Sequence, residues 1–284
     1  MPTITFSFRD FQKLLGKRTS PEEFGALLLL YAKAEVEKCE SDEVTLKLDD
    51  TNLPYLWCPE GLARLLRGML GLQKGTPKLK VSGGSYKIIV DSSVRSVRPF
   101  ITAFVAKGKR IDDYLLKQLV QLQEKFCESY GRKRQKASIG LYAYKKIAFP
   151  VRYKAVEPAS ASFVPLDFDR ALSLAEILRQ HPKGQQYAWI LKGSRNYPLL
   201  VDSRGEILSF PPIINSSTSG RLQTGDSGLL FEATGTDEES VNLAANIFAQ
   251  NLAERGFGIF PATVSYKGRS VTMPSLKAEK VKIT

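Results

Sequence analysis

The chain has 284 residues, of which 43% are hydrophobic and 25% charged, the usual composition of a soluble globular protein. Its 41 Lys and Arg against 29 Asp and Glu give a net charge of +12. This excess favours a polyanionic partner, nucleic acid ahead of a membrane surface, although a basic, well-solvated surface is the plainer interpretation. One histidine and three scattered cysteines argue against a structural metal site and indicate a reducing compartment, the cytoplasm. No apolar run approaches the ~20 residues that span a membrane.

The first 83 residues predict a small α+β unit. Alternating apolar residues at positions 4, 6 and 8, and again at 44, 46 and 48, predict two strands. Ser20, Pro21 and Glu23 form the signature of a capping box and begin a helix. A second helix is expected over residues 59–70, with Gly71 ending it. Residues 73–84 are rich in Lys, Gly, Ser and Pro, so the expected division is a domain of 1–83, a domain of 84–275 and a linker of 276–284.

The second part predicts helices and strands in irregular alternation, so the expected fold class is α+β, with a larger mixed α/β domain after the small one. Apolar residues at helical spacing over 111–126 predict a helix with Asp112 and Asp113 in its first turn and Gly131 as its C-terminal cap. Ser173 and Glu176 predict a capping box for a short helix, and Asp237 begins a longer one. Strands are expected at residues 86–90, 100–105, 187–191 and 229–234, with a hairpin turning at 267–268.

Residues 195–215, with the sequence RNYPLLVDSRGEILSFPPIIN, predict a hairpin that continues in an unusual way. Two apolar runs flank the turn at Asp202 to Gly205. Pro211 and Pro212 then stop the ladder and are followed at once by two isoleucines. This pattern is typical of an edge strand leaving a sheet, but it also fits the wall of a pocket.

Positive charge is concentrated in one part of the chain. Residues 107–154 hold 13 Lys and Arg against 4 Asp and Glu. Within them, Arg132, Lys133, Arg134 and Lys136 directly follow a predicted helix. Such a cluster either binds phosphate groups of RNA or simply caps the helix in solvent.

Seven short motifs then occur in a fixed order: GRKRQKASIG at 131–140, EPAS at 157–160, FVPL at 163–166, HPKG at 181–184, YAWI at 187–190, SFPPIIN at 209–215 and EATGTD at 232–237. The first unit adds DTN at 50–52, Pro54 and EGLAR at 60–64. Together they resemble, over nearly the whole chain, the N-terminal region of the β subunit of archaeal/eukaryal-type phenylalanyl-tRNA synthetase, including its editing domain.

The resemblance implies proofreading: hydrolysis of tyrosine wrongly esterified to the phenylalanine tRNA. An apolar pocket rejects an added hydroxyl by only ~10²-fold, whereas a site that hydrogen-bonds that hydroxyl rejects the analogue lacking it by roughly 10⁴–10⁵. The editing pocket should therefore be an apolar slot with one buried acceptor. The resemblance also implies the acceptor end of tRNA(Phe) and an α subunit as partners, no cofactor in this region, and ATP and Mg for the full enzyme.

The family's editing-site residues carry over to Leu200, Ser209, Glu232 and Thr234. The implied roles are that Glu232 accepts from the tyrosine hydroxyl or orients water, and that Ser209 and Thr234 hold water or the ribose. Leu200 shapes the slot. Pro211, Asn215 and His181 are assigned to substrate binding, the four cations at 132–136 to RNA, and no residue to a metal.

Plainer interpretations exist for each of these residues. Glu232, Ser209 and Thr234 taken alone are ordinary strand residues, and Glu232 would then face solvent. His181 before Pro182 is a typical last residue of a helix, where an imidazolium is mildly favourable. For the whole region, the alternative function is a tRNA-binding or subunit-assembly module with an inactive editing site.

Overall fold

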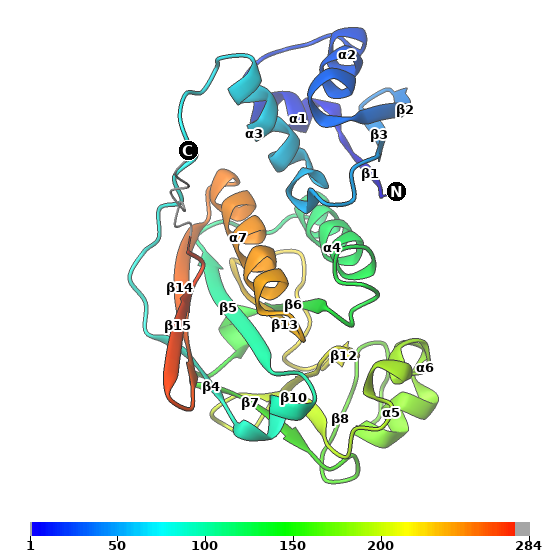
Figure 1. The fold of residues 1–284 in the computed structure, drawn as a ribbon, viewed down its shortest axis with the longest axis vertical. Helices are drawn as coiled ribbons and strands as arrows, with labels where there is room; N and C mark the ends of the chain where they lie inside the picture. Colours follow the sequence, from blue (N-terminus) through cyan, green and yellow to red (C-terminus); the bar gives the residue numbers. More distant parts are fainter. Residues whose placement is uncertain (1, 276–284) are drawn as a thin grey trace, which may run out of the picture.

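A computed structural model describes residues 2–275 of the chain, and Figure 1 shows its two parts, a small N-terminal unit above a larger part built on one extended sheet. The predicted α+β class is confirmed, with strands predominating in the larger part. Within the described residues, no helix is both long and apolar enough to cross a membrane.

The N-terminal unit is a three-stranded antiparallel sheet of order β1-β3-β2 packed with three helices. Buried Ile4 and Phe6 alternate with half-buried polar residues along the first strand, as the period of a half-buried strand requires. The elements are β1 (Thr3–Ser7), α1 (Phe8–Leu15), α2 (Pro21–Ala32), β2 (Ala34–Glu40), β3 (Glu43–Leu48), η1 (Pro54–Leu56) and α3 (Pro59–Met69).

The first strand ends earlier than the apolar alternation predicted. Phe8 begins α1 instead of ending β1, because the Ser7 side chain accepts from the Asp10 backbone N–H and caps the helix. The capping box expected on α2 is half formed. Ser20 accepts from the Glu23 N–H, while the Glu23 carboxylate pairs with Lys17 at 2.8 Å.

The larger part contains a ten-stranded sheet in which nine strands follow the order β12-β11-β10-β7-β4-β14-β5-β13-β6, and β15 pairs with β14. The pairs β4–β14 and β4–β7 are parallel, and the other pairs are antiparallel. Its strands are β4 (Tyr86–Val90), β5 (Phe100–Lys107), β6 (Ala137–Ala143), β7 (Val151–Val156), β10 (Tyr197–Val201), β11 (Ile207–Phe210), β12 (Ile214–Asn215), β13 (Gly228–Gly235), β14 (Gly258–Tyr266) and β15 (Arg269–Met273), with β8 (Ser162–Phe163) and β9 (Leu172–Ser173) forming a separate pair.

The two edges of this sheet, β6 and β12, approach each other. Side chains bridge them, since Tyr142 of β6 is bonded to Ser209 of β11 and Asn215 of β12 reaches the Leu141 carbonyl. The sheet is therefore nearly closed, and its interior is filled by an apolar cluster that includes Val105, Tyr142 and Leu200.

Helices cover the outside of the sheet. They are α4 (Asp113–Glu128), α5 (Leu174–Gln180), α6 (Pro182–Tyr187) and α7 (Glu238–Glu254), with 3-10 turns at η2 (Ser92–Ser96), η3 (Tyr144–Lys146) and η4 (Ala188–Leu191). Figure 1 shows α7 lying along β5 and β13, where Phe248 packs on Phe231 with ring centroids 4.9 Å apart. The predicted caps at Asp237 and in the Ser173–Glu176 box are confirmed.

Two local predictions were wrong. Residues 187–191 form the end of α6 and the turn η4, because Pro182 fits the first turn of a helix that His181 caps. Gly131 does not cap α4, which ends at Glu128 with Ser129 as its C-cap. The glycine is needed there for space, since a Cβ would press on the backbone carbonyls of Cys127 and Ala137.

The two parts share one continuous apolar core, which contains Phe11 and Leu66 of the first unit and Phe126 and Leu252 of the second. Arg255 joins them by two bonds to Asp10, at 2.7 and 2.8 Å, and one to Glu60 at 2.6 Å. The domain boundary near residue 83 stays a prediction. The expected linker of 276–284 lies outside the described residues.

Candidate active site

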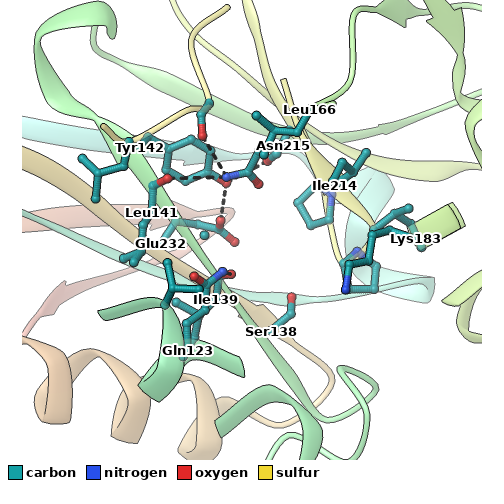
Figure 2. A pocket seen from close by; sticks show the side chains of 18 of the residues that line it. Gln123, Ser138, Ile139, Leu141, Tyr142, Leu166, Lys183, Ile214, Asn215 and Glu232 are labelled. Carbon is teal, nitrogen blue, oxygen red and sulfur yellow. Dashed lines mark hydrogen bonds between the residues drawn. The ribbon is translucent and has the colours of Figure 1, made fainter. Parts of the chain in front are cut away.

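A cavity of about 460 Å³ lies where the edge strands of the nearly closed sheet meet. Its walls come from the middle of β6, from residues 209–215 of β11 and β12, and from one side of α4. Figure 2 shows Glu232, Tyr142 and Asn215 directed toward the same region, with Gln123 and Lys183 at its border. The hairpin and the residues beyond its two prolines do form a pocket wall.

Glu232 lies at the floor of this cavity. Its side chain is 2% exposed, and the Tyr142 hydroxyl contacts its Oε2 at 2.6 Å. Burial raises the pKa of Glu232 to about 7, and hydrogen bonding from Tyr142, the charge of Arg98 and the Thr234 hydroxyl act in the opposite direction. The carboxyl group is thus divided between its ionised and protonated forms near neutral pH.

Thr234 faces the same side of β13 as Glu232, as the strand period predicts, but it does not line the cavity. It is held from below by Arg98, which is 1% exposed. Arg98 Nε donates to the Thr234 hydroxyl at 2.9 Å and Nη2 donates to the Thr234 carbonyl at 2.6 Å. Nη2 also donates to Ser138 at 3.0 Å. Burial lowers the pKa of Arg98. Thr234 therefore lies behind the cavity surface, where it is bonded to Arg98 next to Glu232 on the same strand.

Ser209 and Leu200 are cross-strand partners on β11 and β10. Ser209 is 1% exposed, lines the cavity, and lies 2.9 Å from the Tyr142 hydroxyl. Leu200 is fully buried in the apolar cluster inside the sheet and does not line the cavity. It packs behind the wall that Ser209 and Tyr142 present.

Pro211 and Asn215 both line the cavity. The Asn215 side-chain amide donates to the Gly220 carbonyl at 3.1 Å, which fastens the segment after β12. Arg134, which also lines the cavity, holds this wall in place, since its Nη1 donates to the Pro212 and Ile213 carbonyls at 3.1 and 3.0 Å. The Arg134 guanidinium also lies over the Tyr187 ring, 4.2 Å from the centroid.

The four basic residues at 132–136 differ in their surroundings: two are exposed and two contact other parts of the chain. Arg132 and Lys133 are exposed, and both have positive φ, at 50° and 51°. Lys136 pairs with Asp237 at 3.3 Å and lies over the Tyr130 ring. Arg134 and Lys136 thus have partners within the chain, and Arg132 and Lys133 retain the predicted availability to RNA.

His181 lies beside the cavity without lining it. It is 3% exposed and sits between α5 and α6. Its Nδ1 accepts from the Lys183 N–H at 3.1 Å, and its Nε2 is 2.9 Å from the Leu166 carbonyl, which requires Nε2 to carry the proton. Leu166 and Lys183 do line the cavity, so His181 contacts the cavity only through these two neighbours.

The sequence alone did not reveal Tyr142 and Gly140. Gly140 is the cross-strand partner of Glu232, and a glycine inside a strand is a known signal of close approach. That signal was available within the motif at 131–140.

The cavity brings together acidic, hydroxyl and basic side chains. Residues 2–275 contain no group of three or more His, Cys, Asp and Glu that could hold a metal ion. The cavity instead combines one buried carboxyl group with the Ser209 and Tyr142 hydroxyls, and cationic Arg134, Lys183 and Arg221 lie along its border together with Asp167 and Glu124.

No family model matches the chain. Curated relatives are phenylalanine–tRNA ligase beta subunits. The protein of Thermococcus kodakarensis is 39% identical over 287 residues, and that of Pyrococcus abyssi is 40% identical over 287 residues. The protein of Archaeoglobus fulgidus is 40% identical over 276 residues. These matches cover 100%, 100% and 97% of this chain and 50%, 51% and 49% of the relatives, so the chain spans about half their length.

A solved structure agrees with this relationship. The N-terminal fragment of the phenylalanyl-tRNA synthetase beta subunit from Pyrococcus horikoshii superimposes with a TM-score of 0.93 at 38% identity. The match covers 97% of this chain and 80% of that one. The chain belongs to the phenylalanine–tRNA ligase beta-subunit family and corresponds to its N-terminal region.

Proposed function

We propose that the cavity binds tyrosine esterified to the 3′ end of tRNA(Phe) and that the chain hydrolyses this ester. The observation that carries the proposal is the buried carboxyl group of Glu232 at the floor of the cavity, already bonded to a phenol hydroxyl at 2.6 Å. The site therefore presents a buried acceptor of the kind that a tyrosine side chain requires.

Selection between tyrosine and phenylalanine follows from this acceptor. When tyrosine enters, its hydroxyl donates to the carboxylate and satisfies a buried charge. When phenylalanine enters, the carboxylate loses water and gains no donor, and leaving a buried charged acceptor unpaired is costly. Pockets built on this principle discriminate by roughly 10⁴–10⁵.

Hydrolysis in this site is water attack on the ester carbonyl, with the amino acid released as a carboxylic acid and the ribose hydroxyl as the leaving group. Ser209 lies on the wall within the cavity and would hold the water or the ribose, while Thr234 supports Glu232 from the same strand. The site would speed ester hydrolysis over that in water by holding the ester and the attacking water in line and by keeping the polar side chains of the cavity in place before the reaction. A neighbouring ribose hydroxyl of the tRNA is a further candidate for assisting the water.

With the tyrosine in the cavity, the bound tRNA would extend outward past the cationic residues at the cavity border. Lys183 and Arg221 lie at the cavity, and Arg132 and Lys133 are exposed on the loop after α4. These charges would attract the phosphates of the acceptor end. Further cofactors are not needed for ester hydrolysis. ATP, Mg and an α subunit belong to our proposal for the whole enzyme, in which this chain is the proofreading region.

The exposed pair Arg132 and Lys133 also supports a second candidate function, a tRNA-binding or subunit-assembly module with an inactive site. One assay separates the two functions: the 284-residue chain is incubated with tyrosyl-tRNA(Phe) and with phenylalanyl-tRNA(Phe), and deacylation is followed. The proposal expects faster loss of tyrosine than of phenylalanine. Binding of both tRNAs without hydrolysis of either would favour the module.

A further inference from the structure

We propose that Tyr142 is a positioning residue for this site: its hydroxyl fixes one oxygen of the Glu232 carboxylate, leaves the other for the substrate phenol, and couples Glu232 to Ser209. The inference rests on the proposed function, since it explains how a carboxylate can distinguish tyrosine from phenylalanine. It concerns a residue that belongs to neither of the two strands carrying Glu232 and Ser209.

The geometry places Tyr142 at the junction of the two candidate catalytic side chains. Its hydroxyl lies 2.6 Å from Glu232 Oε2 and 2.9 Å from Ser209 Oγ, and Tyr142 is 1% exposed. Tyr142 is bonded to Oε2 and not to Oε1, while the Thr234 hydroxyl also acts on this carboxyl group and lowers its pKa. A carboxylate held at one oxygen keeps a defined direction for the other.

Gly140 provides the space in which this pair forms. A Cβ placed on Gly140 would lie 2.5 Å from Glu232 Oε2 and closer still to the Tyr142 hydroxyl. The hydrogen-bonded oxygens therefore lie directly over the glycine. No other residue type could stand at 140 without displacing one of them.

Proton counting shows how Tyr142 links the other two groups. A phenol carries one proton and can donate it once. When Glu232 is ionised, Tyr142 donates to the carboxylate and the Ser209 hydroxyl donates to Tyr142. When Glu232 is protonated, the carboxyl group can donate to Tyr142, which then donates to Ser209. The ionisation of Glu232 thus sets whether Ser209 turns its lone pairs or its proton toward the cavity.

Removal of the Tyr142 hydroxyl would change both the charge and the direction of Glu232. The pKa of Glu232 is raised by burial, and the bond from Tyr142 is the foremost of the influences that lower it. The other groups facing Glu232 are Arg98, which is bonded to Thr234, and Tyr153 of β7. Two further cations, Arg134 and Lys183, line the cavity. Without the hydroxyl the carboxyl group would be protonated more often and free to rotate, so it would accept the substrate phenol less selectively.

A purely structural role is the competing explanation, because Tyr142 belongs to the apolar cluster inside the sheet. Tyr153 offers a matched control. It is fully buried in the same cluster and also faces Glu232, but its hydroxyl donates to the Arg98 backbone carbonyl at 2.8 Å and to neither Glu232 nor Ser209. Tyr142→Phe and Tyr153→Phe remove the same atom from similar surroundings.

The experiment measures binding of two non-hydrolysable probes, adenosine carrying tyrosine or phenylalanine through a 3′ amide, to the 284-residue chain by calorimetry. Wild type is expected to prefer the tyrosyl probe, Tyr142→Phe to lose about tenfold or more of this preference, and Tyr153→Phe to stay within about twofold of wild type. The pH midpoint of the preference is expected to rise in Tyr142→Phe alone. Gly140→Ala, which keeps the phenol but displaces the pair, should lose the preference too and serves if Tyr142→Phe does not fold.

The outcomes distinguish the role of Tyr142 from the proposed function of the cavity. A wild-type preference that survives in Tyr142→Phe, or that falls equally in Tyr153→Phe, overturns the role of Tyr142 and leaves the proposed function standing. Absence of any preference in wild type rejects the proposed function itself, and the inference with it.

Discussion

Glu232 and Gly140 face each other across β13 and β6, and the missing side chain of Gly140 gives the Glu232 carboxylate its place. A buried acid normally requires a counter-charge or several donors. Here the acid is accommodated by free space on one side, a phenol donor on the other, and the more distant Arg98. The pocket is thus defined by a pair of residues 92 positions apart, since 232 and 140 meet only in the folded sheet.

Gly140→Ala should destabilise the chain by about 1–3 kcal/mol, because the new methyl group overlaps fixed oxygens in a packed site. Chemical denaturation would measure the change. Gly68→Ala is the matched control, since Gly68 lies within α3 and a Cβ there meets nothing within 4 Å. Alanine should stabilise that helix by up to about 1 kcal/mol. Equal effects of both substitutions would contradict the close approach at Gly140.

Glu232→Gln should make the chain more stable above neutral pH. The pKa of Glu232 is about 7 in the folded chain against 4.5 for an ordinary glutamate, so the folded state holds this proton more tightly than the unfolded state. Its contribution to stability is fully present below about pH 4.5 and is lost as the pH rises through 7, a loss of at most about 3 kcal/mol. Glutamine carries no charge and escapes this loss.

The measurement is the free energy of unfolding of wild type and Glu232→Gln at pH 4.5, 6, 7 and 8. The variant is expected to gain about 1–3 kcal/mol relative to wild type between the two ends of this range. A difference that stays constant from pH 4.5 to 8 would mean that Glu232 is not a buried acid with a raised pKa.

Selectivity should have the opposite pH dependence from stability. The ionised carboxylate is the stronger acceptor for a phenol, so the preference for tyrosine should increase as the pH rises through about 7. The ratio of hydrolysis rates for tyrosyl and phenylalanyl esters is the suitable quantity, because the intrinsic lability of both esters to hydroxide divides out. A ratio that does not change between pH 5.5 and 8 would show that recognition does not depend on the charge of Glu232.

Arg132 and Lys133 should contribute to tRNA affinity without affecting selectivity. Because both have positive φ, asparagine is a neutral replacement with a side chain that tolerates this backbone conformation. Arg132→Asn with Lys133→Asn should reduce the salt dependence of tRNA binding by roughly 0.7–0.9 in log–log slope for each phosphate that is no longer neutralised. Filter binding at several salt concentrations would measure this, and an unchanged slope would assign the two charges to solvent.

Arg255→Ala should destabilise the entire chain. The substitution leaves Asp10 and the nearly buried Glu60 without their cation, which costs about 3 kcal/mol or more. Thermal unfolding should still show one transition, since both parts share a core. Arg9→Ala breaks an exposed pair with Asp42 and should cost less than about 1 kcal/mol. Separate melting of residues 1–83 in the variant would instead support two independent domains.

Local signals in the sequence predicted much of the fold. Ser173 with Glu176 and Asp237 each mark a helix start by side-chain chemistry that acts within three residues, and the structure confirms both. Residues 187–191 have the residue types of a strand, and the predicted strand there was wrong. Pro182 and the His181 cap begin a helix upstream that extends to Tyr187. The sequence reveals this helix only when the helix-start residues before position 187 are considered together with the strand-like residues after it.

The candidate site was less accessible to such reasoning. Glu232 and Ser209 were identified through family resemblance, and their patterns alone are those of ordinary strand residues. Arg98 and Tyr142 were missed because their partners lie 136 and 90 residues away. Nothing near them in the sequence distinguishes a buried arginine from a surface one, or a tyrosine of the site from one that fills the core.

The most direct test compares wild type with Glu232→Ala in the hydrolysis of tyrosyl- and phenylalanyl-tRNA(Phe). Wild type should favour the tyrosyl ester by roughly 10⁴-fold or more, and Glu232→Ala should abolish tyrosine release while tRNA affinity stays nearly the same. If both proteins release tyrosine at equal rates, Glu232 is not the group that recognises the substrate, and the account is wrong.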